Sequence, residues 1–110
     1  YTAATSSWDG PVLIESDNAG DVSSPQVAFD GSGNAMVVWS EYDAVNSIHS
    51  DIWSNYYMPG VGWDTPVRVE SGATDTSLDP QLAFDGNGDA FCVWSRTENG
   101  VTEVWANRYM

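Results

Sequence analysis

Apolar and polar side chains alternate along most of this chain, with the period expected of β-strands that bury one face. In the first half, four short runs predict strands at residues 11–15, 25–30, 34–43 and 50–58. Each run is rich in β-branched and aromatic residues and is bounded by Gly, Asp, Asn, Ser or Pro. Helix signals are almost absent. The sequence therefore predicts an all-β fold.

The same pattern returns in the second half as an internal repeat. The matching segments are WDGPVLIES (8–16) with WDTPVRVES (63–71), PQVAFDGSGNAMVVWS (25–40) with PQLAFDGNGDAFCVWS (80–95), and DIWSNYYM (51–58) with EVWANRYM (103–110). The first two pairs are 55 residues apart and the third is 52 apart, so the length difference falls in one loop. The six tryptophans obey the repeat as the pairs Trp8 and Trp63, Trp39 and Trp94, and Trp53 and Trp105. We therefore expect one domain, 1–110, with repeat 1 at about 8–62 and repeat 2 at about 63–110.

Four antiparallel strands in a repeat of about 50 residues are typical of a β-propeller blade. We expect 25–30 to be the innermost strand, 34–43 and 50–58 to follow outward, and 66–70 to form the outer edge. A β-sandwich or a small closed barrel is the alternative. Copying of the pattern down to the tryptophans argues against a sandwich.

Two blades are too few to close a propeller, which needs about four to eight. Blade faces that carry Val, Met, Phe and Trp would expose more apolar area than monomers usually do. We therefore expect the chain to bind copies of itself in a closed ring, with a trimer of six blades favoured over a dimer or a tetramer. The outer strand that repeat 2 lacks is expected from residues 11–15 of the same chain or of a neighbour. A fragment of a longer repeat array is the alternative.

The charge balance narrows the possible partners. Sixteen Asp and Glu against three Lys and Arg give a net charge of -13, which repels nucleic acid and anionic membrane surfaces. The apolar runs are too short for a spanning helix, and the single Cys92 excludes a disulfide within the chain. The acidic charge and the scarcity of lysine favour an extracellular or cell-surface location.

Two segments carry a family resemblance: AFDGSGNAMVVW and AFDGNGDAFCVW resemble the Asp-x-x-Gly-Asn strand-turn-strand cores of several β-propeller repeat families. The resemblance implies the propeller fold. The plan of two blades in a chain of this size is also similar to that of small trimeric six-bladed lectins, which implies carbohydrate binding. A likeness to the Asp-box of sialidases is superficial, because Ala28 and Ala83 stand where that motif has Ser or Thr.

The glycine hairpins at 30–34 and 85–89 place oxygen side chains at alternate positions, as calcium loops do. The second hairpin looks like the start of the calcium-binding hairpins of integrin-type propellers, but Ala90 replaces the sharp-turn glycine. Asp-Gly and Asn-Gly also favour tight turns. We interpret both hairpins as turns, with calcium bound by Asp85, Asn87 and Asp89 or by Asp30 and Asn34 as the alternative, and we expect no metal or other cofactor.

The chain offers few groups for catalysis. His49 is the only histidine and has no counterpart in repeat 2, and Cys92 falls at a strand position expected to be buried. Carboxylate pairs such as Glu98 with Glu103 arise readily by chance among so many acidic residues. We therefore expect a non-enzymatic protein, with a hydrolase as the minor alternative.

Exposed tryptophan faces beside carboxylates and an arginine are what a sugar ring requires. The candidate ligand-binding residues form two groups at different ends of a blade, of which one would be the site. They are Trp8 and Trp63 before the outer strand, and Glu41, Tyr42, Arg96 and Glu98 at the wide loop. The sequence thus predicts a lectin-like binding module. A purely structural, self-assembling scaffold without a ligand is the alternative.

Overall fold

A computed structural model describes residues 10–15, 21–42, 50–69 and 76–110. The described residues contain eight β-strands and no helix, which confirms the prediction of an all-β fold. The strands are β1 (Val22–Phe29), β2 (Ala35–Tyr42), β3 (Ser50–Met58), β4 (Gly62–Trp63), β5 (Val67–Arg68), β6 (Thr76–Phe84), β7 (Ala90–Glu98) and β8 (Val101–Tyr109).

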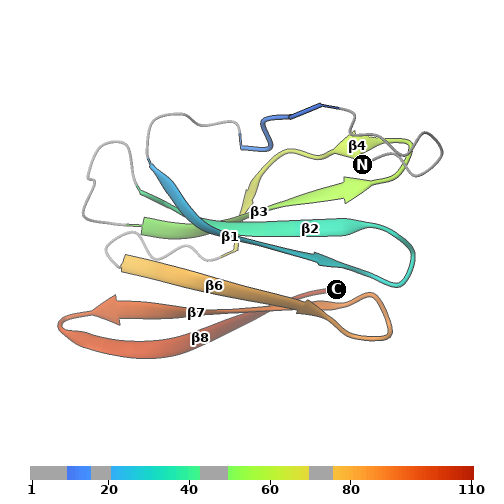
Figure 1. The fold of residues 1–110 in the computed structure, drawn as a ribbon. Helices are drawn as coiled ribbons and strands as arrows, with labels where there is room; N and C mark the ends of the chain where they lie inside the picture. Colours follow the sequence, from blue (N-terminus) through green and yellow to red (C-terminus); the bar gives the residue numbers. More distant parts are fainter. Residues whose placement is uncertain (1–9, 16–20, 43–49, 70–75) are drawn as a thin grey trace.

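The strands form two antiparallel meanders (Figure 1), and the first takes its last strand, β5, from the start of repeat 2. In the first meander, β1 to β5, strand β2 lies between β1 and β3, and the short strands β4 and β5 pair with the other edge of β3. In the second meander, β6 to β8, strand β7 lies between β6 and β8. A single parallel bridge, Ser50 with Thr76, connects the meanders into one open mixed sheet. The ring of blades and the oligomer stay predictions.

Strands β1 and β6, which correspond in the repeat, have the same β-bulge. In β1 the register skips between Ser23 and Gln26, and in β6 it skips between Leu78 and Gln81. Each bulge contains a residue with positive φ, Ser24 at 56° and Asp79 at 54°. Two residues face one on the partner strand, which bends and twists the strand locally. Since both repeats have the same irregularity, they have the same local backbone as well as similar sequences.

The core lies between the two meanders. It consists of Val38 and Ile52 from the first meander and Cys92 and Trp94 from the second. Cys92 is 5% exposed, which confirms the expectation of a buried, apolar cysteine, and this burial raises the pKa of its thiol to about 11. Trp39 and Trp94 are buried, whereas Trp105 on β8 is 41% exposed.

Two sequence predictions need correction. Residues 11–15 form no strand, because no strand pairs with them within the described residues. The predicted outer strand 66–70 is reduced to Val67–Arg68, where it pairs with Trp53 and Ser54. The predicted length difference between repeats falls at the hairpin from β7 to β8, where Asn99 and Gly100 have positive φ. Such a pair suits a two-residue hairpin turn. Its counterpart, 43–49, lies outside the described residues.

Candidate functional site

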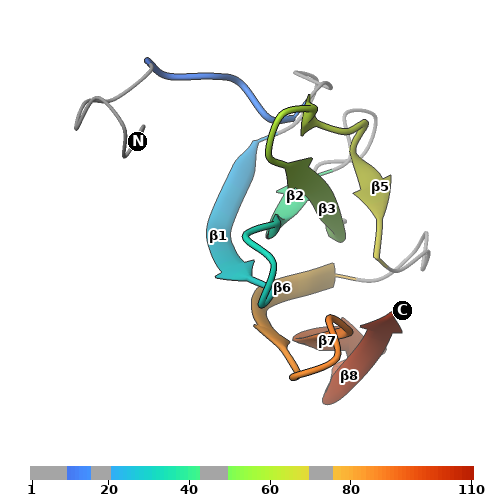
Figure 2. The same ribbon diagram turned by 90° about the vertical axis from the view of Figure 1, so that its right-hand side faces the viewer.

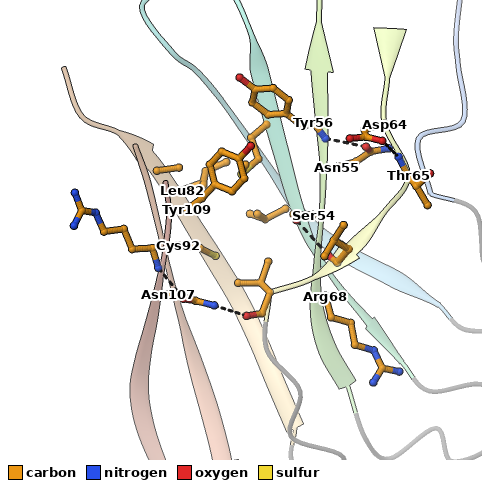
Figure 3. Close-up of a pocket in the computed structure, with 16 residues that line it drawn as sticks. Ser54, Asn55, Tyr56, Asp64, Thr65, Arg68, Leu82, Cys92, Asn107 and Tyr109 are labelled. Atoms are coloured by element: carbon orange, nitrogen blue, oxygen red, sulfur yellow. Dashed lines mark hydrogen bonds between the residues drawn. The ribbon is translucent and has the colours of Figure 1, made fainter. Parts of the chain in front are cut away.

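A cavity of about 210 Å³ lies between the two meanders (Figure 3). Its apolar wall comes from both repeats, so neither repeat alone could form it. The apolar lining residues are Met36, Val38, Val67, Val69, Leu82, Ala90 and Cys92. Strands β2 and β5 supply one side of this wall, and β6 and β7 supply the other.

Two tyrosines from facing strands meet at the cavity. The rings of Tyr56 on β3 and Tyr109 on β8 have centroids 5.8 Å apart and are tilted by 33°. Tyr109 is 48% exposed, so part of its ring is available to a ligand. Aromatic faces of this kind bind the C–H groups of apolar or amphipathic rings.

Polar residues also line the cavity. Asp64 accepts a hydrogen bond from the Thr65 amide at 2.8 Å, and both residues are exposed. Arg108 Nη2 lies 2.6 Å from Asp89 Oδ2, which directs the guanidinium toward the hairpin between β6 and β7. Asn107 Nδ2 donates to the Val69 carbonyl at 2.7 Å and thus ties β8 to the outer segment of the first meander.

The hairpin between β1 and β2 is connected to the cavity through Tyr56. The Asp30 carboxylate accepts hydrogen bonds from the amides of Ser32 and Asn34 and from Asn34 Nδ2, at 2.8 to 3.0 Å. The Asn34 side chain, and then the backbone amides, hold the pKa of Asp30 below its ordinary value. The Tyr56 hydroxyl donates to Asp30 Oδ2 at 3.3 Å. Burial and the Asp30 charge raise the pKa of Tyr56.

The hairpin between β6 and β7 begins with the same pattern of hydrogen bonds to an aspartate. Asp85 Oδ1 accepts hydrogen bonds from the amides of Asn87 and Asp89 at 2.8 and 3.1 Å. These bonds are what a tight Asx turn requires. Within the described residues, no three His, Cys, Asp or Glu side chains are grouped so that they could hold a metal ion.

The sequence-predicted site residues that the structure describes do not line the cavity. Trp63 on β4 packs against Tyr57, with ring centroids 5.3 Å apart. Tyr42 pairs with Ser50 at one end of β3, whereas Trp63 pairs with Tyr57 near the other. The two groups therefore lie at opposite ends of the meander. Trp8 and His49 lie outside the described residues.

The wide-loop group is divided between the repeats. Glu41 on β2 is buried and accepts a hydrogen bond from Trp39 Nε1 at 3.2 Å. Arg96 on β7 lies over the Trp105 ring, 4.4 Å from its centroid. Glu98 is exposed at the end of β7. Glu41 and Arg96 occupy equivalent positions 55 residues apart, one on each meander.

Sequence reasoning missed all of the cavity residues, among them Tyr56, Asp64, Thr65, Arg108 and Tyr109. A signal existed in the recurring third strand, SNYYM and ANRYM, where an aromatic or cationic residue follows an asparagine. That signal does not reveal that Tyr56 of one repeat meets Tyr109 of the other. Their contact depends on which faces of the two meanders pack together.

Comparisons with family models, with curated proteins and with solved structures find no match to this chain. Within the described residues there is also no helix that could cross a lipid bilayer.

Proposed function

We propose that the chain is a non-enzymatic binding module made of two β-propeller-type blades, and that it binds a small carbohydrate between them. The observation that carries the proposal is the cavity between the meanders, with its apolar wall and its pair of tyrosines. An extracellular or cell-surface location, suggested by the acidic charge, belongs to the same proposal.

The size of the cavity favours a small ligand. Pockets for drug-sized ligands usually occupy about 300 to 1,000 Å³, and this cavity has about 210 Å³. One saccharide unit is therefore a better match than an extended chain. Its C–H face would pack on the Tyr109 ring, and its hydroxyls would meet the Asp64 carboxylate and the Thr65 hydroxyl.

The chemistry of the wall supports binding rather than covalent catalysis. Cys92 is the thiol in the apolar wall, and burial raises its pKa to about 11. At neutral pH it is therefore a neutral thiol, which is a weak nucleophile. We assign it an apolar packing role.

A glycan array followed by calorimetric titration of the best monosaccharide tests the proposal. Tyr109→Ala should weaken binding by about tenfold or more, because one ring-stacking contact contributes on the order of 1.4 kcal/mol. Tyr109→Phe, which keeps the ring, should retain most of the affinity.

Variants at the sequence-predicted positions serve as matched controls. Trp63→Ala and Tyr42→Ala each remove an aromatic side chain outside the cavity, so the cavity site predicts little loss of affinity in either. Loss in Trp63→Ala alone would move the site to the group of Trp8 and Trp63. Loss in Tyr42→Ala, Arg96→Gln and Glu98→Gln would move it to the wide loop.

A purely structural scaffold is the second candidate function. The observation that favours it is the strand β8, whose nine residues are all exposed. A scaffold predicts that no glycan gives a saturable signal that free sugar competes away. That result would reject the carbohydrate proposal and leave self-association as the function.

A further inference from the structure

Within the described part of the chain, strand β8 has one bare edge and one bare face. Strand β3, its counterpart, pairs with β2 on one edge and with β4 and β5 on the other. Strand β8 pairs only with β7 among the described residues. On the face of the strand, Val104 of β8 is 82% exposed, whereas its counterpart Ile52 is fully buried in the core between the meanders. The second meander therefore lacks a neighbour that the first meander has.

The segment that would complete β8 is present at the other end of the chain. Residues 10–15 correspond to 65–70, the segment that supplies β5 to β3. Val12 and Leu13 of this segment are 69% and 67% exposed. Figure 2 shows 10–15 (blue) beyond the first meander, whereas β7 and β8 lie at the opposite end of the molecule. One chain therefore does not bring them together.

Two equivalent hydrogen bonds indicate that 10–15 lies against the first meander as the segment around Val69 lies against the second. Asn107 Nδ2 donates to the Val69 carbonyl, which belongs to the outer segment of the preceding meander, at 2.7 Å. Asn55 Nδ2 donates to the Ile14 carbonyl at 2.8 Å. Asn55 and Asn107 correspond in the repeat, as do Ile14 and Val69. Residues 10–15 thus contact the first meander in the way that the outer segment of a preceding meander would.

We propose that this preceding meander is the second meander of another copy, so that residues 10–15 of one chain pair with β8 of the next. This inference rests on the exposed strand and on the repeat, and it does not require a carbohydrate ligand. The occupant of the bare edge is therefore a second copy of this chain.

The repeat fixes the register of the contact between copies. Arg68 pairs with Trp53 and Val67 with Ser54, and the Val69 amide donates to the Ile52 carbonyl at 2.8 Å. The corresponding contacts place Leu13 opposite Trp105 and Val12 opposite Ala106 of the other copy. The Ile14 amide then donates to the Val104 carbonyl.

Side chains add a contact specific to this junction. Within one chain, Tyr56 of the first meander meets Tyr109 of the second. At the junction, the same two positions are held by Arg108 of one copy and Tyr57 of the next. A guanidinium over an aromatic ring is favourable, so the substitution of Arg for Tyr in repeat 2 suits this contact. Because the contact is head-to-tail, it closes into a ring if the rotation between neighbouring copies is a whole fraction of a full turn without translation along the axis, and otherwise builds an open filament.

Native mass spectrometry of the full chain, beside light scattering, tests the proposal with two matched valine variants. Val104→Lys places a charge where the neighbouring copy would cover it. Val101→Lys adds the same charge at a side chain that is 58% exposed on the same strand, beyond the reach of 10–15. The wild type and Val101→Lys should give a closed trimer at micromolar concentration, and Val104→Lys should reduce the trimer at least tenfold in favour of monomer.

A monomeric wild type at micromolar concentration would overturn the proposal, and so would an oligomer that both variants weaken equally. Circular dichroism of each variant separates loss of assembly from loss of folding. The cavity lies within one chain, so it does not depend on assembly. Sugar binding by monomeric Val104→Lys would therefore support the carbohydrate proposal independently of the proposal on assembly.

Discussion

The two meanders have almost the same sequence pattern and very different burial. Trp39 and Trp94, at equivalent positions, are both buried, at 2% and 3% exposed. Ile52 and Val104 are also equivalent, yet one is fully buried and the other is 82% exposed. Trp39 and Trp94 are both covered by residues of the same chain. The second pair is covered only where another repeat follows, so burial at that position depends on a neighbour.

The meanders also differ in how the third strand binds the hairpin beside it. In the first, Tyr56 donates a hydrogen bond to Asp30 at 3.3 Å. In the second, Arg108 forms an ion pair with Asp89 at 2.6 Å. The neutral hydroxyl donor of Tyr56 is replaced by the cationic Arg108, and the accepting carboxylate moves from Asp30 to Asp89, which is the counterpart of Asn34. This places the cationic side chain on the meander whose face is bare.

Truncating the two equivalent apolar residues gives the largest expected effect. Ile52→Ala should lower the free energy of unfolding by about 2–5 kcal/mol, because it leaves a cavity in a packed core. In dilute, dissociated protein, Val104→Ala should change it by no more than about 0.5 kcal/mol, because the side chain is exposed. Urea unfolding of both variants measures the difference.

Protein concentration sharpens this comparison. The stability lost in Val104→Ala should grow as the protein concentration rises, because neighbouring copies then cover the residue in the wild type. If Val104→Ala in dilute protein lost as much stability as Ile52→Ala, the two meanders would be packed alike and the difference between them would disappear.

The two asparagines provide the next largest effect. Asn55 is buried, and its side chain donates a hydrogen bond to the Ile14 carbonyl and accepts one from the Tyr56 amide. Asn55→Ala should therefore lower the free energy of unfolding by about 1–3 kcal/mol, because it leaves buried groups unpaired. Asn107 makes the equivalent bonds while exposed, so Asn107→Ala should cost about 0.5–1.5 kcal/mol. Thermal unfolding of the two variants measures both losses of stability. Equal losses in dilute protein would contradict the difference in burial between Asn55 and Asn107.

The hairpin contacts should differ in their response to salt. Arg108→Gln removes an ion pair whose arginine side chain is 47% exposed, so its cost should be below about 1 kcal/mol and should fall as salt is added. Tyr56→Phe removes a hydrogen bond in a less exposed place and should respond less to salt. Unfolding at low and high ionic strength distinguishes them, and a salt-independent cost of Arg108→Gln would argue against the ion pair.

The smallest expected effect is a pH dependence of the first hairpin. The pKa of Asp30 is lowered from its ordinary value of 3.8 in the folded chain, so its ionised form favours folding. Its contribution is present above pH 3.8 and is lost as the pH falls below that value through the folded pKa. The stability difference between the wild type and Asp30→Asn should therefore shrink on acidification. A constant difference down to about pH 2 would contradict this.

The repeat made most of the strand order predictable. Period-two alternation and the glycine turns located β1, β2, β3, β6, β7 and β8 to within a few residues. The predicted outer strands failed for a physical reason. A strand needs a backbone partner, and 11–15 has none within the described residues, while Val67–Arg68 has one for only two residues.

The site was much less predictable than the fold. The sequence identified aromatic and charged residues but could not tell that Tyr57 would pack on Trp63 or that Arg96 would lie over Trp105. The contact of Tyr56 with Tyr109 joins two repeats, and no local pattern encodes it. Such contacts are set by which face of one meander packs against which face of the next.

Ring closure requires residues 10–15 of one copy to pair with β8 of another, and an engineered disulfide at the inferred register tests this most directly. Paired residues on antiparallel strands lie about 4.5–5.5 Å apart at Cα, within disulfide reach. In a Cys92→Ala background, Val12→Cys with Ala106→Cys should link separate chains into a trimer on a non-reducing gel, and Val12→Cys with Val101→Cys should not. A product that stays monomeric, or equal linking by both pairs, would contradict the proposed pairing between copies.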